Sequence, residues 1–146
     1  VHDIRSLVYR EFGRAGGNEP AMALSLLSFG FKHGVPAGCD LLFDVRFLPN
    51  PHFVAGLREA TGLDEPVLDF LERQPDFENL VARLADLLGF LLPRYAQENR
   101  SYLTVGVGCT GGRHRSVAVV ERLADRLAGS GWTARRNHRE LARERG

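Results

Sequence analysis

Residues 102–117 read YLTVGVGCTGGRHRSV, and this stretch contains the pattern that decides the fold. Its first part, residues 102–108, is mostly apolar and has the length of a buried strand. A glycine-rich turn follows, and a helix is expected over about residues 116–127 because Gly129 and Gly131 then supply a stop. A strand that passes through a glycine-rich turn into a helix is typical of layered α/β domains.

The alternation of strands and helices continues on both sides of this stretch. Further strands are expected at 21–31 and 41–48, which are rich in Leu, Phe and Val and are bounded by Gly and Pro. A last strand is expected near 132–137. Apolar residues at three- and four-residue spacing predict a helical region over residues 53–97. Its expected parts are a short segment that ends at Gly62, a helix opened by Asp64 and a long helix opened by Pro75. A basic helical tail completes the chain.

These elements predict an α/β fold: a single layered domain with a mainly parallel or mixed sheet flanked by helices. At 146 residues the chain has the length of about one domain. We expect residues 18–146 to form this domain and residues 1–17 to form a connector helix and loop. The chain starts at Val1 without a signal-peptide pattern, so we expect it to be a fragment of a longer protein.

The composition argues against several classes of protein. Hydrophobic residues make up 44% of the chain and charged residues 25%, and no apolar run reaches the roughly 18 residues that a membrane span needs. The two cysteines, Cys39 and Cys109, lack the spacing of metal ligands, which indicates reduced thiols in a cytoplasmic protein. We therefore expect no membrane association and no metal site.

The glycine-rich turn has the chemistry of an anion-binding loop. Backbone N–H groups and the positive end of a helix dipole converge where such a turn enters a helix. Gly111 and Gly112 let the backbone approach a ligand closely, and Arg115 can hold a phosphate through a bidentate fork. Further hydroxyl and cationic groups come from Thr110, Arg113, His114 and Ser116. A phosphate or phosphosugar is the natural ligand, and the alternative is a structural turn whose basic residues face water.

The same loop matches the C-x5-R-[ST] spacing of cysteine-dependent phosphatases, in which a thiolate attacks phosphorus and the arginine holds its oxygens. Cys109, Arg115 and Ser116 occupy these positions. Such an enzyme also needs a general acid, and the best candidate, Asp44, falls in the middle of an expected strand. Gly108 stands where these enzymes commonly have histidine. We therefore expect Cys109 to be a buried thiol beside the ligand, and a cysteine phosphatase remains the alternative function.

A second group of polar residues accompanies the strand expected at 41–48. Asp44 and Arg46 are two residues apart on one face, where they can pair, and His52 follows a sharp Pro-Asn-Pro turn. One interpretation is a structural ion pair with a capping histidine. The other is that Asp44 and His52 contact a ligand, because open α/β sheets collect ligands at the carboxyl ends of their strands. Lys32, after the first strand, either extends the positive surface or belongs to an ordinary solvated loop.

The positive charge of the chain is concentrated near its C-terminus. The net charge is only +1, but several arginines lie close together at the end of the chain: Arg135, Arg136, Arg139, Arg143 and Arg145. A local positive patch steers anionic partners toward it. Glu140 and Glu144 interrupt this patch, so a solvated amphipathic helix is the alternative interpretation of the tail.

Four motifs occur in a fixed order along the chain: SFGFKHG at 28–34, FDVRFLPNPH at 43–52, TGLD at 61–64 and CTGGRHRSV at 109–117. Together they resemble the C-terminal domain of the bacterial RNase adapter protein RapZ family, and the resemblance runs from about Ser28 to the C-terminus. Members of that family also carry an N-terminal P-loop kinase-like domain. This chain has no G-x-x-x-x-G-K-[ST] segment, so it resembles the C-terminal half alone, and a nucleotide is expected only in the missing half.

The resemblance implies a non-catalytic regulatory domain with no cofactor of its own. In the best-studied branch of the family this domain senses glucosamine-6-phosphate and binds small regulatory RNAs, one of which is presented to the endoribonuclease RNase E. The implied partners are therefore a phosphorylated aminosugar, small RNA, RNase E and further copies of the same chain. A purely structural assembly domain for the kinase-like half is a weaker alternative.

The loop chemistry and the resemblance together define two sets of expected site residues. The ligand-binding set is Asp44, His52, Cys109, Thr110, Gly111, Gly112, Arg115 and Ser116. The RNA-binding set is Lys32, Arg113, His114, Arg135, Arg136, Arg139, Arg143 and Arg145. If the two ligands share the basic surface, they should compete for the domain.

Overall fold

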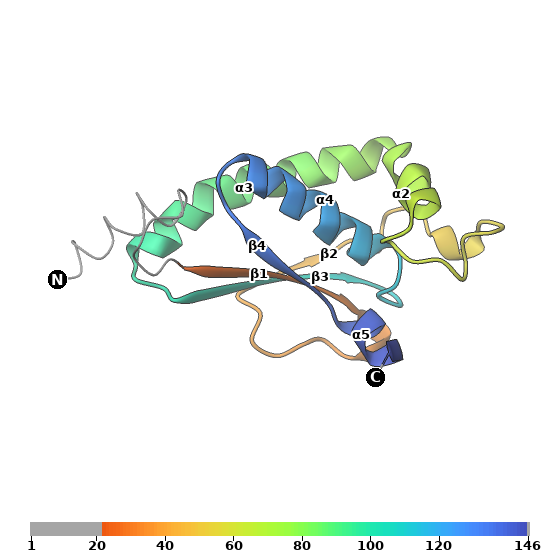
Figure 1. The fold of residues 1–146 in the computed structure, drawn as a ribbon, viewed down its shortest axis with the longest axis horizontal. Coiled ribbons are helices and arrows are strands. Elements are labelled where there is room, and N and C mark those ends of the chain that lie inside the picture. Colours follow the sequence, from red (N-terminus) through yellow and green to blue (C-terminus); the bar gives the residue numbers. More distant parts are fainter. Residues whose placement is uncertain (1–21, 146) are drawn as a thin grey trace.

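Four parallel strands form the centre of the structure, a computed structural model that describes residues 22–145 (Figure 1). The strands are β1 (Ala23–Gly30), β2 (Leu41–Asp44), β3 (Tyr102–Cys109) and β4 (Ala134–His138). Their order in the sheet is β2-β3-β1-β4, and each neighbouring pair is parallel. The α/β class and the parallel sheet predicted from the sequence are therefore confirmed.

Helices α2 (Glu65–Glu72), α3 (Pro75–Gln97) and α4 (Arg115–Gly129) lie in the connections between these strands, and α5 (Arg139–Arg145) follows β4. The connections also contain the short 3-10 turns η1 (Phe31–His33) and η2 (Pro51–Phe53). Helices α3 and α4 lie on the same side of the sheet, whereas α5 lies beside the carboxyl ends of the strands (Figure 1). This arrangement leaves the carboxyl edge of the sheet bordered by loops and by the start of α4.

The main core lies between the sheet and helices α3 and α4. On β3 the side chains of Leu103, Val105 and Val107 are fully buried, as expected for alternate residues that face one side of a sheet. On α3 the apolar residues recur every three or four positions, so one stripe of the helix faces the core: Phe77, Val81, Leu84, Leu88 and Leu92. No helix within residues 22–145 has the length and apolar character needed to cross a membrane.

The chain between β1 and β2 crosses the opposite face of the sheet (Figure 1). This crossing depends on Gly106 of β3, because a Cβ atom there would lie 2.8 Å from the sulfur of Cys39. The rings of Phe29 and Phe31 pack edge to face on this side, with centroids 4.9 Å apart. The connection thereby brings η1 and Lys32 to the carboxyl edge of the sheet.

Two predicted elements differ from the structure. The strand expected at 41–48 ends at Asp44, because its carboxylate accepts a hydrogen bond from the backbone N–H of Arg46 at 2.9 Å and turns the chain. The helical segment expected to end at Gly62 consists of turns after η2. The helix predicted from about residue 116 begins at Arg115, and the expected connector at 1–17 lies outside the described residues.

Candidate functional site

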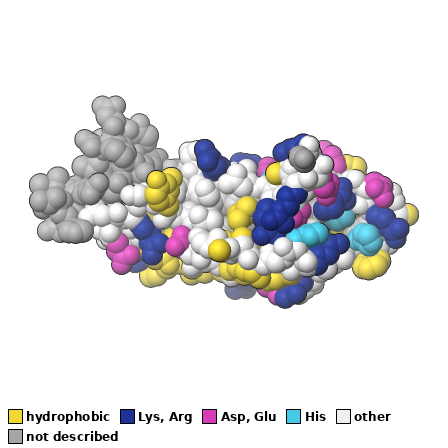
Figure 2. Space-filling view, turned by 90° about the horizontal axis from the view of Figure 1, so that it is seen from below, with side chains coloured by type: hydrophobic (Ala, Val, Ile, Leu, Met, Phe, Trp, Pro, Cys, Tyr) yellow, Lys and Arg dark blue, Asp and Glu magenta, His cyan; other side chains and the backbone are white. Residues whose placement is uncertain are grey.

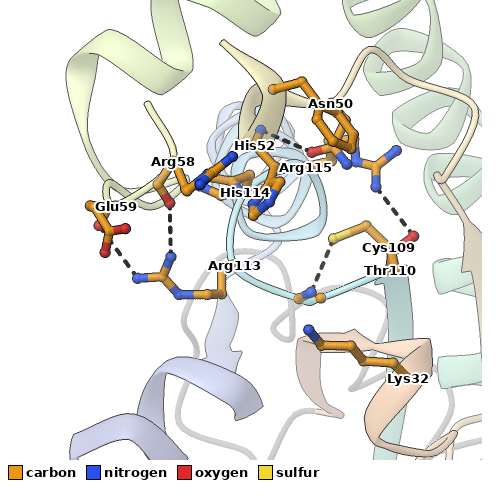
Figure 3. A pocket seen from close by; sticks show the side chains of 13 residues that line it. Lys32, Asn50, His52, Arg58, Glu59, Cys109, Thr110, Arg113, His114 and Arg115 are labelled. Carbon is orange, nitrogen blue, oxygen red and sulfur yellow. Dashed lines mark hydrogen bonds between the residues drawn. The ribbon is translucent and has the colours of Figure 1, made fainter. Parts of the chain in front are cut away.

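The candidate site lies where β3 passes through a glycine-rich loop into α4. Residues 109–115 line a cavity of about 370 Å³ (Figure 3). Lys32 and residues of the segment 50–59 complete its wall. The carboxyl ends of β1 and β3 and the chain that follows β2 therefore meet at one cavity, as expected for an open parallel sheet.

Gly112 shapes the loop because no other residue fits its position. Its φ of 76° lies in the left-handed region that favours glycine. A Cβ atom at this position would lie 2.5 Å from Cγ of Glu140 and 2.5 Å from the backbone nitrogen of Gly30. The loop is therefore seated directly on the end of β1 and on the start of α5.

Arg115 is a nearly buried cation at the N-terminus of α4, with 5% of its surface exposed. Its Nη1 donates to the carbonyls of Arg46 at 2.7 Å and Leu48 at 3.0 Å, and its Nη2 donates to Oγ1 of Thr110 at 3.4 Å. Among residues 22–145, no carboxylate forms an ion pair with it. A buried guanidinium without a counter-ion provides strong electrostatic attraction for an anion in the cavity.

Cys109 lies at the base of the cavity and is 2% exposed. Its sulfur accepts a hydrogen bond from the N–H of Gly112 at 3.3 Å and lies 3.1 Å from Oγ of Ser116. Ser116 is fully buried behind the thiol and does not line the cavity. Both side chains thus hold the turn of the loop, whereas Thr110 and the two loop glycines face the space itself.

The basic residues that follow the loop fasten the opposite wall of the cavity. Arg113 donates to the carbonyls of residues 58–60 over distances of 3.2 to 3.5 Å (Figure 3). The ring of His114 contacts the carbonyl of Leu57 at 3.1 Å, and Arg115 binds two carbonyls further upstream. The contacts of Arg113 and His114 engage carbonyls of the segment that was predicted to be helical, and they help to hold it as a series of turns.

His114 is only 6% exposed, so its side chain does not lie on the basic surface predicted from the sequence. Burial lowers its pKa below the usual value for histidine, and the charge of Arg113 lowers it further, against the raising effect of nearby carbonyls. The neutral ring donates through Nε2, because the carbonyl of Leu57 can only accept. The position of His114 therefore supports a structural function.

Asp44 does not line the cavity, although it was expected there. It is the last residue of β2, not a mid-strand residue, and its Oδ2 pairs with Nη2 of Arg46 at 2.6 Å. Hydrogen bonds from Arg46 lower the pKa of this carboxyl despite some desolvation. The guanidinium of Arg46 in turn stacks over the ring of Phe31 at 4.0 Å. The expected ion pair is present, and it occupies both carboxylate oxygens.

The segment after β2 contributes a predicted residue and several that sequence reasoning missed. His52 lines the cavity, and Oδ1 of Asn50 caps η2 by accepting from the N–H of His52 at 3.0 Å. Asn50, Arg58 and Glu59 also line the cavity, but nothing in their local sequence marked them. The one available signal was their nearness to the Pro-Asn-Pro turn, but the region after this turn was predicted to be helical, so these residues were not considered.

The two glutamates of the C-terminal tail attach α5 to the site. Glu140 is 4% exposed, and its Oε2 accepts from the N–H of Gly30 at 2.9 Å and pairs with Arg139 at 2.8 Å. Glu144 pairs with Arg113 at 2.7 Å. Burial alone would raise the pKa of Glu140, but the hydrogen bond from Gly30 and the charge of Arg139 outweigh it and lower the pKa. These carboxylates therefore dock the tail.

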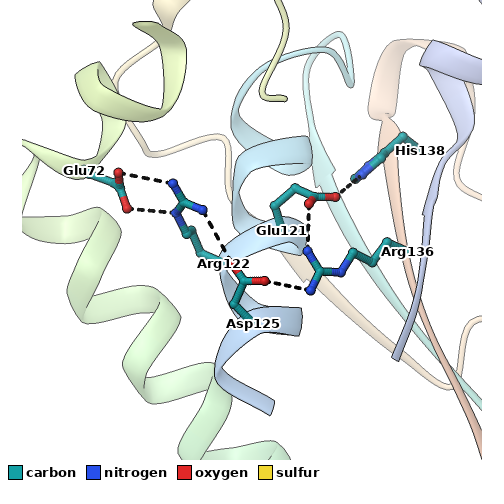
Figure 4. A network of polar contacts seen from close by, with 6 residues as sticks. All are labelled: Glu72, Glu121, Arg122, Asp125, Arg136 and His138. Carbon is teal, nitrogen blue, oxygen red and sulfur yellow. Dashed lines mark hydrogen bonds and ion pairs between the residues drawn. The ribbon is translucent and has the colours of Figure 1, made fainter. Parts of the chain in front are cut away.

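Arg136 belongs to a network between β4 and the helices (Figure 4). It binds Glu121 at 2.8 Å and Asp125 at 2.7 Å, both on α4. His138 joins the same network, with Nε2 2.8 Å from Glu121 and Nδ1 2.7 Å from Oγ of Ser28. Ser28 is fully buried and does not line the cavity, so this network supports the sheet.

Apart from the buried His114, the predicted RNA-binding residues fall into two groups. Four form ion pairs, namely Arg113, Arg136, Arg139 and Arg143. Within the part of the chain that the structure describes, three have exposed cationic groups with no ion pair: Lys32, Arg135 and Arg145. Figure 2 shows Lys, Arg and His side chains gathered toward the end of the molecule that carries the site.

Comparisons with known proteins agree over nearly the whole chain. The family model described as the RapZ C-terminal domain matches residues 22–142. A nucleotide-binding protein of Anaeromyxobacter dehalogenans strain 2CP-C is 49% identical over 144 residues, which cover 99% of this chain and 48% of that protein. One of Sorangium cellulosum is 50% identical over 144 residues, which cover 98% of this chain and 41% of that protein. The chain therefore spans about half the length of the curated relatives it matches.

Proposed function

The chain belongs to the RapZ C-terminal domain family, and on this premise we propose that it is a non-catalytic regulatory domain that binds a phosphorylated aminosugar such as glucosamine-6-phosphate. The phosphate would occupy the glycine-rich loop between β3 and α4. The domain would also bind small regulatory RNA as part of an RNase adapter protein. Occupancy of the sugar site would alter RNA binding, because both ligands are anions drawn to the same end of the molecule.

The observation that carries the proposal is the environment of Arg115. This nearly buried guanidinium lines the cavity and forms no ion pair among residues 22–145; its hydrogen bonds go to two backbone carbonyls and to Oγ1 of Thr110. The loop adds the hydroxyl of Thr110 and the helix N-terminus adds N–H groups. A phosphate monoester would satisfy these donors and neutralise the buried charge.

RNA binding is proposed for the cations that remain available near the cavity. Lys32 and Arg58 lie at the cavity, and Arg135 and Arg145 extend the surface along β4 and α5. Contacts of such cations with phosphates supply most of the sequence-independent affinity for RNA. The arginines held by carboxylates would contribute less, because RNA would first have to displace their partners.

Further parts of the proposal concern the whole protein. We propose that it acts in the cytoplasm, forms a homo-oligomer and presents RNA to RNase E. The relatives named nucleotide-binding proteins are about twice as long as this chain, and we propose that their nucleotide is bound in the part that the chain does not span.

A cysteine phosphatase is the second candidate, and the environment of Cys109 favours it. Its sulfur accepts an N–H from the loop and contacts Ser116, and Arg115 lines the same cavity. A thiol beside an arginine in a phosphate-sized loop is the arrangement that such an enzyme needs. The expected general acid Asp44, however, is paired with Arg46 outside the cavity. Turnover of an aryl phosphate by the wild type and its loss in Cys109→Ser would establish this activity in place of the first proposal.

Calorimetric titration with phosphosugars tests the first proposal. Wild-type protein should bind glucosamine-6-phosphate, and Lys32→Ala and Thr110→Val should each weaken binding because both residues line the cavity. Arg94→Ala is a matched control, since this exposed arginine on α3 binds Phe90 of its own helix and does not line the cavity. Absence of binding by the wild type, or equal affinities of all three variants, would contradict the site.

A further inference from the structure

One carboxylate lines the cavity among the residues that the structure describes, and it belongs to Glu59. The other charged residues of the lining are all basic: Lys32, Arg58, Arg113 and Arg115, with His52 and His114 beside them. Within residues 22–145 the Glu59 carboxylate forms no ion pair and no side-chain hydrogen bond. An acceptor without a partner is therefore present in a cavity that otherwise offers donors.

The backbone of Glu59 is held by hydrogen bonds, whereas its carboxylate has no partner among the described residues. The carbonyls of Arg58 and Glu59 both accept hydrogen bonds from Arg113, at 3.2 Å and 3.4 Å. Figure 3 shows Glu59 beside Arg58 and Arg113, on the side of the cavity away from Lys32 and Thr110. A ligand whose phosphate lies in the glycine-rich loop, and which extends across the cavity, would meet this wall.

Asp44 is the competing carboxylate, and its contacts make it a poor acceptor for a ligand. Both of its oxygens are engaged by the side chain of Arg46, at 2.6 to 3.1 Å, and one also accepts from the backbone of Arg46. It lies outside the lining of the cavity. To bind a ligand amine, Asp44 would have to give up a bidentate ion pair.

We propose that Glu59 accepts the ammonium group of the bound aminosugar and makes the site prefer aminosugar phosphates over the corresponding hydroxyl sugars. This inference rests on the proposed function and adds a specificity-determining residue to it. A carboxylate beside a phosphate site repels anions in general, so it disfavours every phosphosugar that carries no positive charge. A ligand with both groups satisfies the basic loop and the acidic wall together.

The test is a pair of titrations with glucosamine-6-phosphate and glucose-6-phosphate, which differ in one amine or hydroxyl. Wild-type protein should bind the amine more tightly by about fivefold, the size expected for a solvent-exposed ion pair. Glu59→Gln should remove this preference and leave glucose-6-phosphate affinity equal or higher. Glu98→Gln, a change at an exposed glutamate just before β3, is the matched control and should keep the preference.

The outcomes separate this inference from the function on which it rests. If the wild type binds both sugars and Glu59→Gln retains the full preference, the assignment of Glu59 is wrong while the phosphosugar site stands. If Asp44→Asn removes the preference and Glu59→Gln does not, the amine binds at Asp44. If the wild type binds neither sugar, both the proposed function and this inference are overturned.

Discussion

Replacing Glu140 by glutamine tests how α5 supports the phosphate loop, and we expect it to lower the free energy of unfolding by about 2–3 kcal/mol. Roughly 1 kcal/mol comes from the weaker, uncharged acceptor that is left for the N–H of Gly30. The remaining 1–2 kcal/mol comes from Arg139, which would lose its carboxylate partner in a largely buried position. For a chain of this length, such a loss corresponds to a fall in Tm of roughly 6–9 °C.

The assay is urea unfolding followed by the fluorescence of Trp132, the single tryptophan, which is 4% exposed. Glu144→Gln is the matched control, because its ion pair with Arg113 has a half-exposed carboxylate and should contribute less than about 1 kcal/mol. Equal losses in Glu140→Gln and Glu144→Gln would refute the anchoring function of Glu140.

Wild type and Glu140→Gln should also differ in how their free energy of unfolding depends on pH. The folded-state pKa of Glu140 lies below its ordinary value, so the folded protein holds this proton more weakly than the unfolded chain. The stabilisation is therefore complete above the ordinary pKa of about 4.5 and is lost as the pH falls through the lower folded value. The difference in stability between wild type and Glu140→Gln should shrink over this acidic range, and a constant difference would contradict the lowered pKa.

Three further predictions address the loop, the buried histidine and the basic surface. Gly112→Ala should abolish phosphosugar binding in calorimetry and lower the free energy of unfolding by several kcal/mol. The reason is that a Cβ atom at this position has no space and the backbone φ is positive. A variant with wild-type affinity would contradict the loop geometry. Because the pKa of His114 is lowered on folding, the stability of the wild type should fall as the pH drops below about 6.5. Urea titrations of His114→Gln at pH 5.5 and 8 should lack this fall. An identical pH profile of the two proteins would argue against a buried neutral ring. Arg135→Ala should weaken RNA binding several-fold in filter-binding assays. Arg136→Ala should weaken it less, because Arg136 is held by two carboxylates. A larger effect of Arg136→Ala would contradict the assignment of the RNA-binding surface.

Local patterns were sufficient to predict the architecture and the loop. The alternation of apolar strands with amphipathic helices predicted the parallel sheet, and the run from Tyr102 to Ser116 predicted the strand, turn and helix that form the site. Pro75 and the spacing of apolar residues after it predicted α3. These features depend on neighbours along the chain, which is why the sequence alone was informative about them.

Contacts between distant residues could not be predicted in this way. The basic residues Arg113 and His114 were expected to face an anionic partner, but they bind carbonyls more than 50 positions earlier in the chain. Glu140 was treated as an interruption of a basic tail, although it accepts a hydrogen bond from the end of β1. A charged side chain has the same local signature whether its partner is solvent, a ligand or a carbonyl from a distant segment.

Asp44 shows how a small local error affects a functional assignment. Apolar residues on both sides of Asp44 suggested that it lay within a strand, but its side chain caps the next turn and ends β2. The residue therefore lies at the carboxyl edge while its carboxylate is occupied by Arg46. The acidic group that does line the cavity, Glu59, lies in a segment without regular structure, where periodicity carries no information.

We propose above that the glycine-rich loop between β3 and α4 holds the phosphate of a phosphorylated aminosugar. The most direct measurement is a crystal structure of the protein with glucosamine-6-phosphate. Phosphate density is expected within hydrogen-bond distance of the loop N–H groups, Thr110 and the guanidinium of Arg115. Density for the sugar phosphate at another place, with an empty loop at saturating ligand, would contradict it.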